Sequence, residues 1–119
     1  MDERKIEAFA EHLMGQLTSA LTMLSVYLGL RLGLFQAMVD EGALNSAELA
    51  AHTGCVDRYV REWLMCMAVC DYVSYDSTSG KYTLPPECAV VLLDQDNPAY
   101  GAASTFAVPS LAGVLPILM

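Results

Sequence analysis

The sequence predicts a mainly α-helical fold, a winged helix-turn-helix with a two-stranded β-hairpin as its wing, preceded by a long N-terminal helix. Three patterns predict it. A capped helix begins after Asn45, a second helix with a strict apolar period follows Gly54, and two β-rich runs then flank a polar loop. Helix, tight turn, helix and hairpin is the element order of a winged helix-turn-helix.

The first helix of the pair carries a start signal with a physical mechanism. Asn45 and Glu48 are spaced so that each side chain can accept a hydrogen bond from the other's backbone N–H, and Leu44 and Leu49 are spaced as a hydrophobic staple. Gly54 then ends the helix, because glycine adopts the left-handed conformation at little cost.

The second helix has the strongest period in the chain. Its apolar residues recur at steps of three and four, at Val56, Tyr59, Val60, Trp63, Leu64, Met67 and Ala68. We expect this face, with Tyr59 and Trp63, to lie in the core. Arg58, Arg61 and Glu62 fall on the opposite face, where Arg58 and Glu62 are spaced as a weak ion pair.

The wing and a short helix complete the domain. The runs 72–75 and 81–84 are rich in β-formers and flank a polar loop of hairpin length. Pro85, Pro86 and Glu87 then predict the start of a helix that covers the core.

The first thirty residues predict one long helix, or two nearly continuous ones. Apolar residues recur along it at Ile6, Phe9, Leu13, Leu17, Ala20, Leu24 and Tyr27, with a second ridge at Met14, Leu21 and Leu28. So wide an apolar surface needs partners on two sides, and a second copy of the chain is the expected one. The candidate dimer-interface residues are Ile6, Phe9, Leu13, Leu17, Leu24 and Leu28.

The stretch from Leu13 to Leu30 carries no charge, and its length alone would permit a membrane span. Gln16, Thr18 and Ser19 interrupt it, so we expect no membrane partner.

The chain divides into residues 1–33, the dimerisation helix; residues 34–93, the winged helix-turn-helix; and residues 94–119, a helical connector. Gly29 and Gly33 mark the first boundary as points of close packing or bending. From residue 97 onward no residue is charged, and the chain ends within an apolar run. Because such a run would stand exposed in water, we expect the connector to be cut short at Met119.

The chain is acidic, with a formal net charge of −8. Its six lysine and arginine residues are too few for the phosphate contacts on which duplex binding depends. A winged helix that reads DNA would use Arg58, Arg61 and Lys81, but Asp57 and Glu62 stand among them. A DNA-binding transcriptional regulator is therefore the alternative function, and nucleic acid is not the expected partner.

No catalytic, cofactor-binding or metal-binding residue is predicted. The four cysteines form no CxxC pair and have no histidine pattern nearby, which indicates free thiols in a reducing cytoplasm. His12 and His52 have no nucleophile at catalytic spacing, and no glycine-rich turn joins a strand to a helix. A charged rather than apolar opening segment also favours a cytoplasmic protein.

Several segments resemble the N-terminal winged-helix region of a bacterial-type group of class I S-adenosylmethionine-dependent methyltransferases. They are GLFQAMVDEGALNSAELAAHTG, RYVREWL, YVSYD, GKYTLPPECAVVL and NPAY, which together cover most of the chain from Gly33 onward. The chain departs from the group at Val56, where an Asp or Ser N-cap is usual.

The resemblance implies a division of labour. The catalytic Rossmann-like domain, which would bind S-adenosylmethionine and transfer its methyl group, is not contained in these residues. This chain would pair two subunits and help close over the substrate, without being catalytic by itself. Its partners would be a second copy and the catalytic domain, and the methyl acceptor is not indicated.

Overall fold

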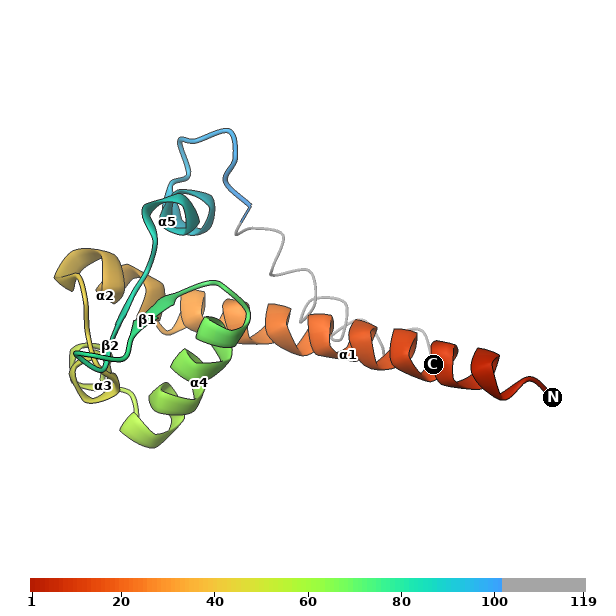
Figure 1. The fold of residues 1–119 in the computed structure, drawn as a ribbon. Helices are drawn as coiled ribbons and strands as arrows, with labels where there is room; N and C mark the ends of the chain where they lie inside the picture. The colour runs from red at the N-terminus through yellow and green to blue at the C-terminus, as the bar shows by residue number, and fades with distance from the viewer. Residues whose placement is uncertain (102–119) are drawn as a thin grey trace, which may run out of the picture.

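The computed structural model describes residues 1–101 of the chain. They form helices and one antiparallel hairpin in the predicted order, which confirms the winged helix-turn-helix (Figure 1). The elements are α1 Glu3–Arg31, α2 Leu34–Glu41, α3 Ser46–Thr53, α4 Asp57–Val69, β1 Ser74–Asp76, β2 Lys81–Thr83 and α5 Pro86–Leu93.

Helix α1 is a single continuous helix that runs outward from the winged domain as a rod (Figure 1). The Asp2 side chain caps its start by accepting a hydrogen bond from the Arg4 backbone N–H at 2.9 Å. Residues 1–21 are all exposed, whereas the last turns pack on α2 and α4 through Val26 and Gly29. Only the C-terminal part of α1 therefore belongs to the domain core.

The predicted capping box is present at the start of α3. The Glu48 N–H donates to Asn45 Oδ1 at 2.8 Å, and the Asn45 N–H donates to Glu48 Oε1 at 3.0 Å. The staple residues Leu44 and Leu49 are both buried. At the start of α4, Val56 provides no side-chain hydrogen bond, as its residue type predicts. The first-turn carboxylate of Asp57 complements the helix dipole there.

Trp63 joins α1 to the winged domain. Its indole Nε1 donates a hydrogen bond to the Ser25 backbone oxygen at 2.9 Å, and its ring lies edge-on to Phe35 with the centroids 4.9 Å apart. Gly29 lies under both rings. A Cβ at this position would fall 2.7 Å from Phe35 Cε2 and would overlap the Trp63 ring. The close packing predicted for this glycine is therefore confirmed.

The wing is attached to the start of α3. Strands β1 and β2 pair with Tyr75 opposite Tyr82, and these rings lie 4.7 Å apart. The Tyr82 N–H donates to the Leu44 oxygen at 2.8 Å, and the Leu44 N–H donates to the Tyr82 oxygen at 3.1 Å. This bridge holds the hairpin beside the helix pair.

The end of the described chain follows α5, which buries Leu92 in the core. Residues 94–101 form turns, and Asn97 Oδ1 accepts a hydrogen bond from the Ala99 N–H at 2.8 Å. The rest of the predicted connector lies outside the described residues. The division of the chain at residues 33 and 93 into functional parts stays a prediction.

Replacing Gly29 with alanine tests the junction. We expect Gly29→Ala to lower the free energy of unfolding by about 2 kcal/mol, because the new methyl group overpacks against two rings. Gly15→Ala is the matched control on the same helix, where nothing lies within 4 Å, and it should stabilise the protein by up to about 1 kcal/mol. Urea unfolding followed by circular dichroism measures both variants. Equal effects would contradict the close packing.

Candidate interaction surface

The predicted interface residues form an exposed apolar surface on α1. The exposed fraction of each residue lies between 38% and 66%. These residues are Ile6, Phe9, Leu13, Leu17, Leu24 and Leu28. A soluble chain rarely leaves so long an apolar row in water without a partner. We call this row the α1 seam.

Except for Leu28 at its end, the α1 seam faces away from the winged domain. A helix turns about 100° per residue, which places Val26 and Gly29 on one side of α1 and Leu17 and Leu24 on nearly the opposite side. The burial agrees, since Val26 and Gly29 are buried while Leu17 and Leu24 are exposed. The seam is therefore not the surface that holds α1 to its own domain.

Three hydroxyl groups along this part of α1 already have acceptors in the helix. Thr18 Oγ1 donates to the Met14 oxygen at 2.9 Å, Thr22 Oγ1 to the Thr18 oxygen at 2.8 Å, and Ser25 Oγ to the Leu21 oxygen at 3.1 Å. Covering this stretch of helix would leave these hydroxyls hydrogen-bonded, so it carries no penalty for an unpaired group.

Helix α1 is also long and apolar enough to cross a membrane, by length and composition only. Of the 18 consecutive residues that make up its most apolar stretch, 11% are buried within the chain. Its surface nevertheless has an apolar side and a polar side, since Gly15, Ser19 and Thr22 fall away from the seam.

A small apolar pocket lies where the seam ends. It has a volume of about 120 Å³ and is lined by Leu28, Leu32, Leu34, Cys55, Tyr59, Val60 and Trp63. Leu28 belongs to both the seam and the pocket, so the two surfaces are continuous. We call it the base pocket.

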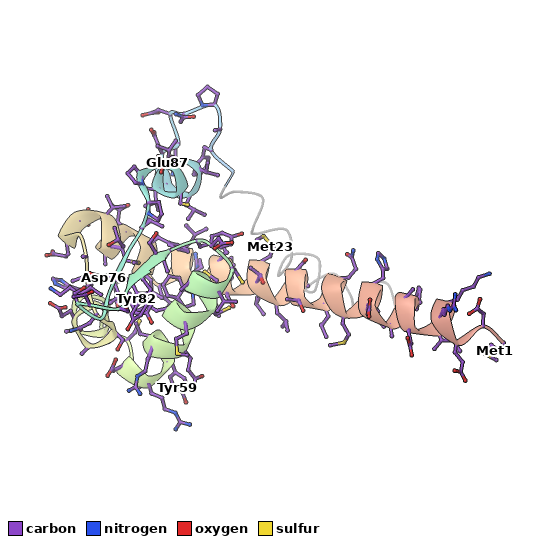
Figure 2. All side chains as sticks on the ribbon, in the orientation of Figure 1. Met1, Met23, Tyr59, Asp76, Tyr82 and Glu87 are labelled. Carbon is purple, nitrogen blue, oxygen red and sulfur yellow. The ribbon has the colours of Figure 1, made fainter. Side chains whose placement is uncertain are left out.

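Tyr59 lies at the rim of the base pocket, and its predicted core position is wrong. Its side chain is 67% exposed and points away from the domain (Figure 2). Tyr59 belongs to the first turn of α4, and no helix within residues 1–101 covers it. Val56, predicted on the same buried face, is also exposed, at 61%, whereas Trp63 is buried as predicted.

The three candidate DNA-contact residues do not form a free basic surface. Arg61 pairs with Asp57 at 3.7 Å, and Lys81 pairs with Glu48 at 3.9 Å. Of the three, only Arg58 has no ion pair within residues 1–101, and the predicted contact between Arg58 and Glu62 is not formed there. Phosphate binding would have to compete with these carboxylates.

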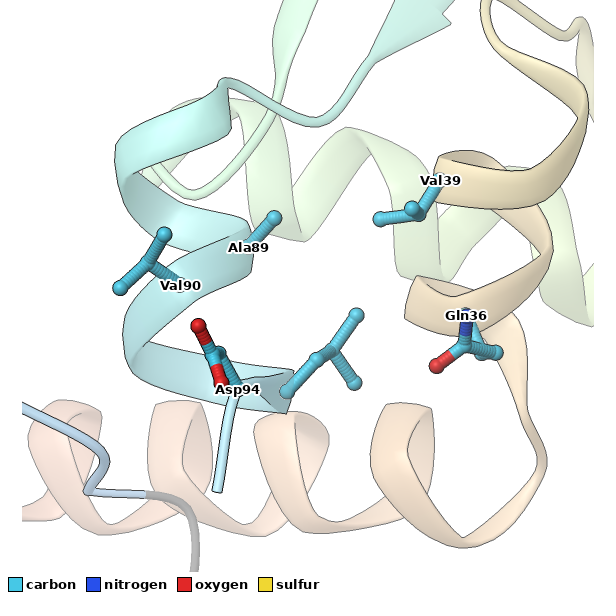
Figure 3. Close-up of a pocket in the computed structure, with 6 residues that line it drawn as sticks. Gln36, Val39, Ala89, Val90 and Asp94 are labelled. Carbon is cyan, nitrogen blue, oxygen red and sulfur yellow. The ribbon is translucent and has the colours of Figure 1, made fainter. Parts of the chain in front are cut away.

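A second, shallower groove separates α2 from α5. It has a volume of about 290 Å³ and is lined by Gln36, Val39, Ala89, Val90, Leu93 and Asp94 (Figure 3). The Gln36 side-chain amide donates to Asp40 Oδ1 at 3.0 Å. The groove is largely apolar, with polar groups at its edge.

The cysteines show no metal site in the described residues, where no group of three or more potential ligands gathers. Cys70 Sγ lies 3.6 Å from Thr22 Oγ1. Burial, and then the neighbouring Cys70, raise the pKa of the Cys66 thiol, which lowers its thiolate fraction and its reactivity.

The described residues do not fit S-adenosylmethionine. Residues 1–101 hold one two-stranded antiparallel sheet and no strand that leads through a glycine-rich turn into a helix. The two pockets described above also lack a set of polar side chains directed at one point, which binding of an adenosyl group would need.

Comparison with a family model decides the identity of the domain. The model described as the Rv2258c-like winged HTH domain matches residues 19–93, which is more than half of the chain. The chain belongs to this family. The matched range begins inside α1, so the Rv2258c-like domain includes the helical turns that pack on α2 and α4.

Solved structures similar to this Rv2258c-like domain include methyltransferases. The mitomycin 7-O-methyltransferase MmcR has a TM-score of 0.72 at 20% identity over 87% of this chain, and PigF with SAH has 0.70 at 20% over 83%. CalO1, a methyltransferase in calicheamicin biosynthesis in its SAH-bound form, has 0.64 at 28% over 88%. A search of curated proteins found no match.

The chain spans about a third of these structures, namely 30% of MmcR, 32% of PigF and 29% of CalO1. The resemblance to the winged-helix region of S-adenosylmethionine-dependent methyltransferases is thereby confirmed.

A direct test of the alternative function follows from the paired cations. We expect no measurable binding of a fluorescent DNA duplex in anisotropy titrations at low salt, because Arg61 and Lys81 are engaged and the net charge is −8. Tight binding that weakens steeply as salt rises would instead identify a DNA-binding protein.

Proposed function

We propose that this chain is the dimerisation and substrate-covering part of an S-adenosylmethionine-dependent methyltransferase and is not catalytic by itself. The outward-facing α1 seam carries the proposal, because it is an exposed apolar row that its own domain leaves uncovered. The similarity to about a third of each methyltransferase structure supports it. Binding of S-adenosylmethionine and methyl transfer would belong to a catalytic domain outside residues 1–119.

A second copy of the chain fits the seam better than a membrane does. Val26, Gly29 and Trp63 tie the last turns of α1 to the winged domain, so a membrane span would draw part of that domain into the bilayer. Glu3, Arg4, Glu7 and other charged residues also occupy the first three turns. We therefore propose a homodimer in the cytoplasm.

The groove between α2 and α5 is the part we assign to substrate covering. It is apolar inside and polar at its rim, which suits the edge of a pocket closed by another domain. The identity of the methyl acceptor does not follow from it.

Charge placed in the seam should abolish the dimer. We expect Leu17→Glu to weaken self-association by at least about 100-fold, because Leu17 is at the middle of the seam and the two new carboxylates would face each other. Ser19→Glu introduces the same charge two residues away, on the polar side of α1, and should leave association unchanged.

Sedimentation velocity at micromolar concentration measures both variants beside the unmodified chain. If the unmodified chain sediments as a monomer, or if both variants remain dimers, the seam is not the interface.

A further inference from the structure

We propose that two α1 helices pair antiparallel about Leu17, so that Ile6 of each protomer fills the base pocket of the other. The inference rests on the proposed dimerisation through α1 and specifies its geometry. It commits the base pocket to one occupant, the first turns of a second copy of this chain.

The spacing of the seam sets this register. Leu17 stands midway between Ile6 and Leu28, so a two-fold axis at Leu17 places Ile6 opposite Leu28 of the other copy. The residues facing the seam are then apolar except for Ser25, which faces Phe9, over a length of about 33 Å at 1.5 Å rise per residue. Closed two-fold pairing of this kind is the commonest arrangement of soluble oligomers.

The base pocket lies where this register brings the partner's first turns. Leu28 and Leu32 form one wall and Tyr59 the rim, at the end of the seam. A parallel pairing would instead bring the two pockets to one end and the two Ile6 side chains to the other. The antiparallel pairing covers Tyr59 and Leu28, which the single chain leaves 67% and 44% exposed.

The charges agree with the same register independently of the apolar residues. An axis at Leu17 places Glu3 opposite Arg31 of the partner. By helical phase Glu3 lies at the edge of the seam, while Arg4 and Lys5 fall away from it. Arg31 is exposed, and Arg58 stands next to the pocket residue Tyr59. The Glu3 carboxylate therefore meets the guanidinium of the partner's Arg31.

Native Cys55 lines the base pocket and allows a cross-linking test. The variant combines Ile6→Cys with alanine at Cys66, Cys70 and Cys88 in the full chain, and is oxidised with diamide at micromolar concentration. We expect a covalent dimer in which peptide mapping finds residue 6 joined to residue 55. Ser19→Cys in the same background, on the polar side of α1, should give no such link, and adding Cys55→Ala should remove it.

The outcomes separate the geometry from the dimer itself. A dimer in sedimentation whose residue 6 joins residue 6, or never joins Cys55, overturns the antiparallel geometry and leaves the proposed function standing. A monomer overturns both.

A charge swap gives a second test that keeps all native cysteines. We expect Glu3→Arg and Arg31→Glu each to weaken the dimer by about three- to tenfold, and the double variant to regain the original dissociation constant. Additive weakening in the double variant would overturn the register, even if the cross-linking variant fails to fold.

Discussion

The close approach of Trp63 to Gly29 is the contact on which the rest of the arrangement depends. The indole N–H is bonded to a backbone oxygen of α1, and the missing Cβ lets the ring lie against the helix. The hydrogen bond fixes the position of α1 along its own axis relative to α4. The glycine fixes which side of α1 lies against the Trp63 ring. Because one residue of rotation would turn α1 by about 100°, this contact determines that the seam faces outward.

In this winged helix-turn-helix, the surface that usually contacts DNA is partly apolar. The helix that enters DNA in such folds is α4, and it carries exposed apolar side chains at Tyr59, Met65 and Val69. Of its two cations, Arg61 is paired with Asp57. The overall charge of −8 acts against phosphate binding as well. Fold alone is a weak guide to function, and this surface favours a protein partner.

Local signals in the sequence predicted most of the fold. The capping box at Asn45 and Glu48, the hairpin around its polar loop and the tight packing at Gly29 each depend on a few neighbouring residues, and each is confirmed. Tyr59 could not be placed in this way. A helical period shows which residues share a face, but not how far the neighbouring helix extends to cover it.

The candidate site was predicted in part. The period along α1 indicated an apolar row, but the side that packs on the domain depends on Trp63, which is far away in sequence. The sequence predicted an ion pair between Arg58 and Glu62, but the ion pair observed on α4 joins Arg61 to Asp57. Which of these pairs forms depends on the side-chain rotamers at the start of the helix. The base pocket, including Leu32 and Cys55, is formed by separate elements, so no single stretch signals it.

The most direct test of the account is the mass of the unmodified chain at sedimentation equilibrium across the micromolar range. The account predicts a reversible equilibrium that reaches twice the chain mass of 12.9 kDa. A mass that stays at that of one chain at every concentration would contradict it.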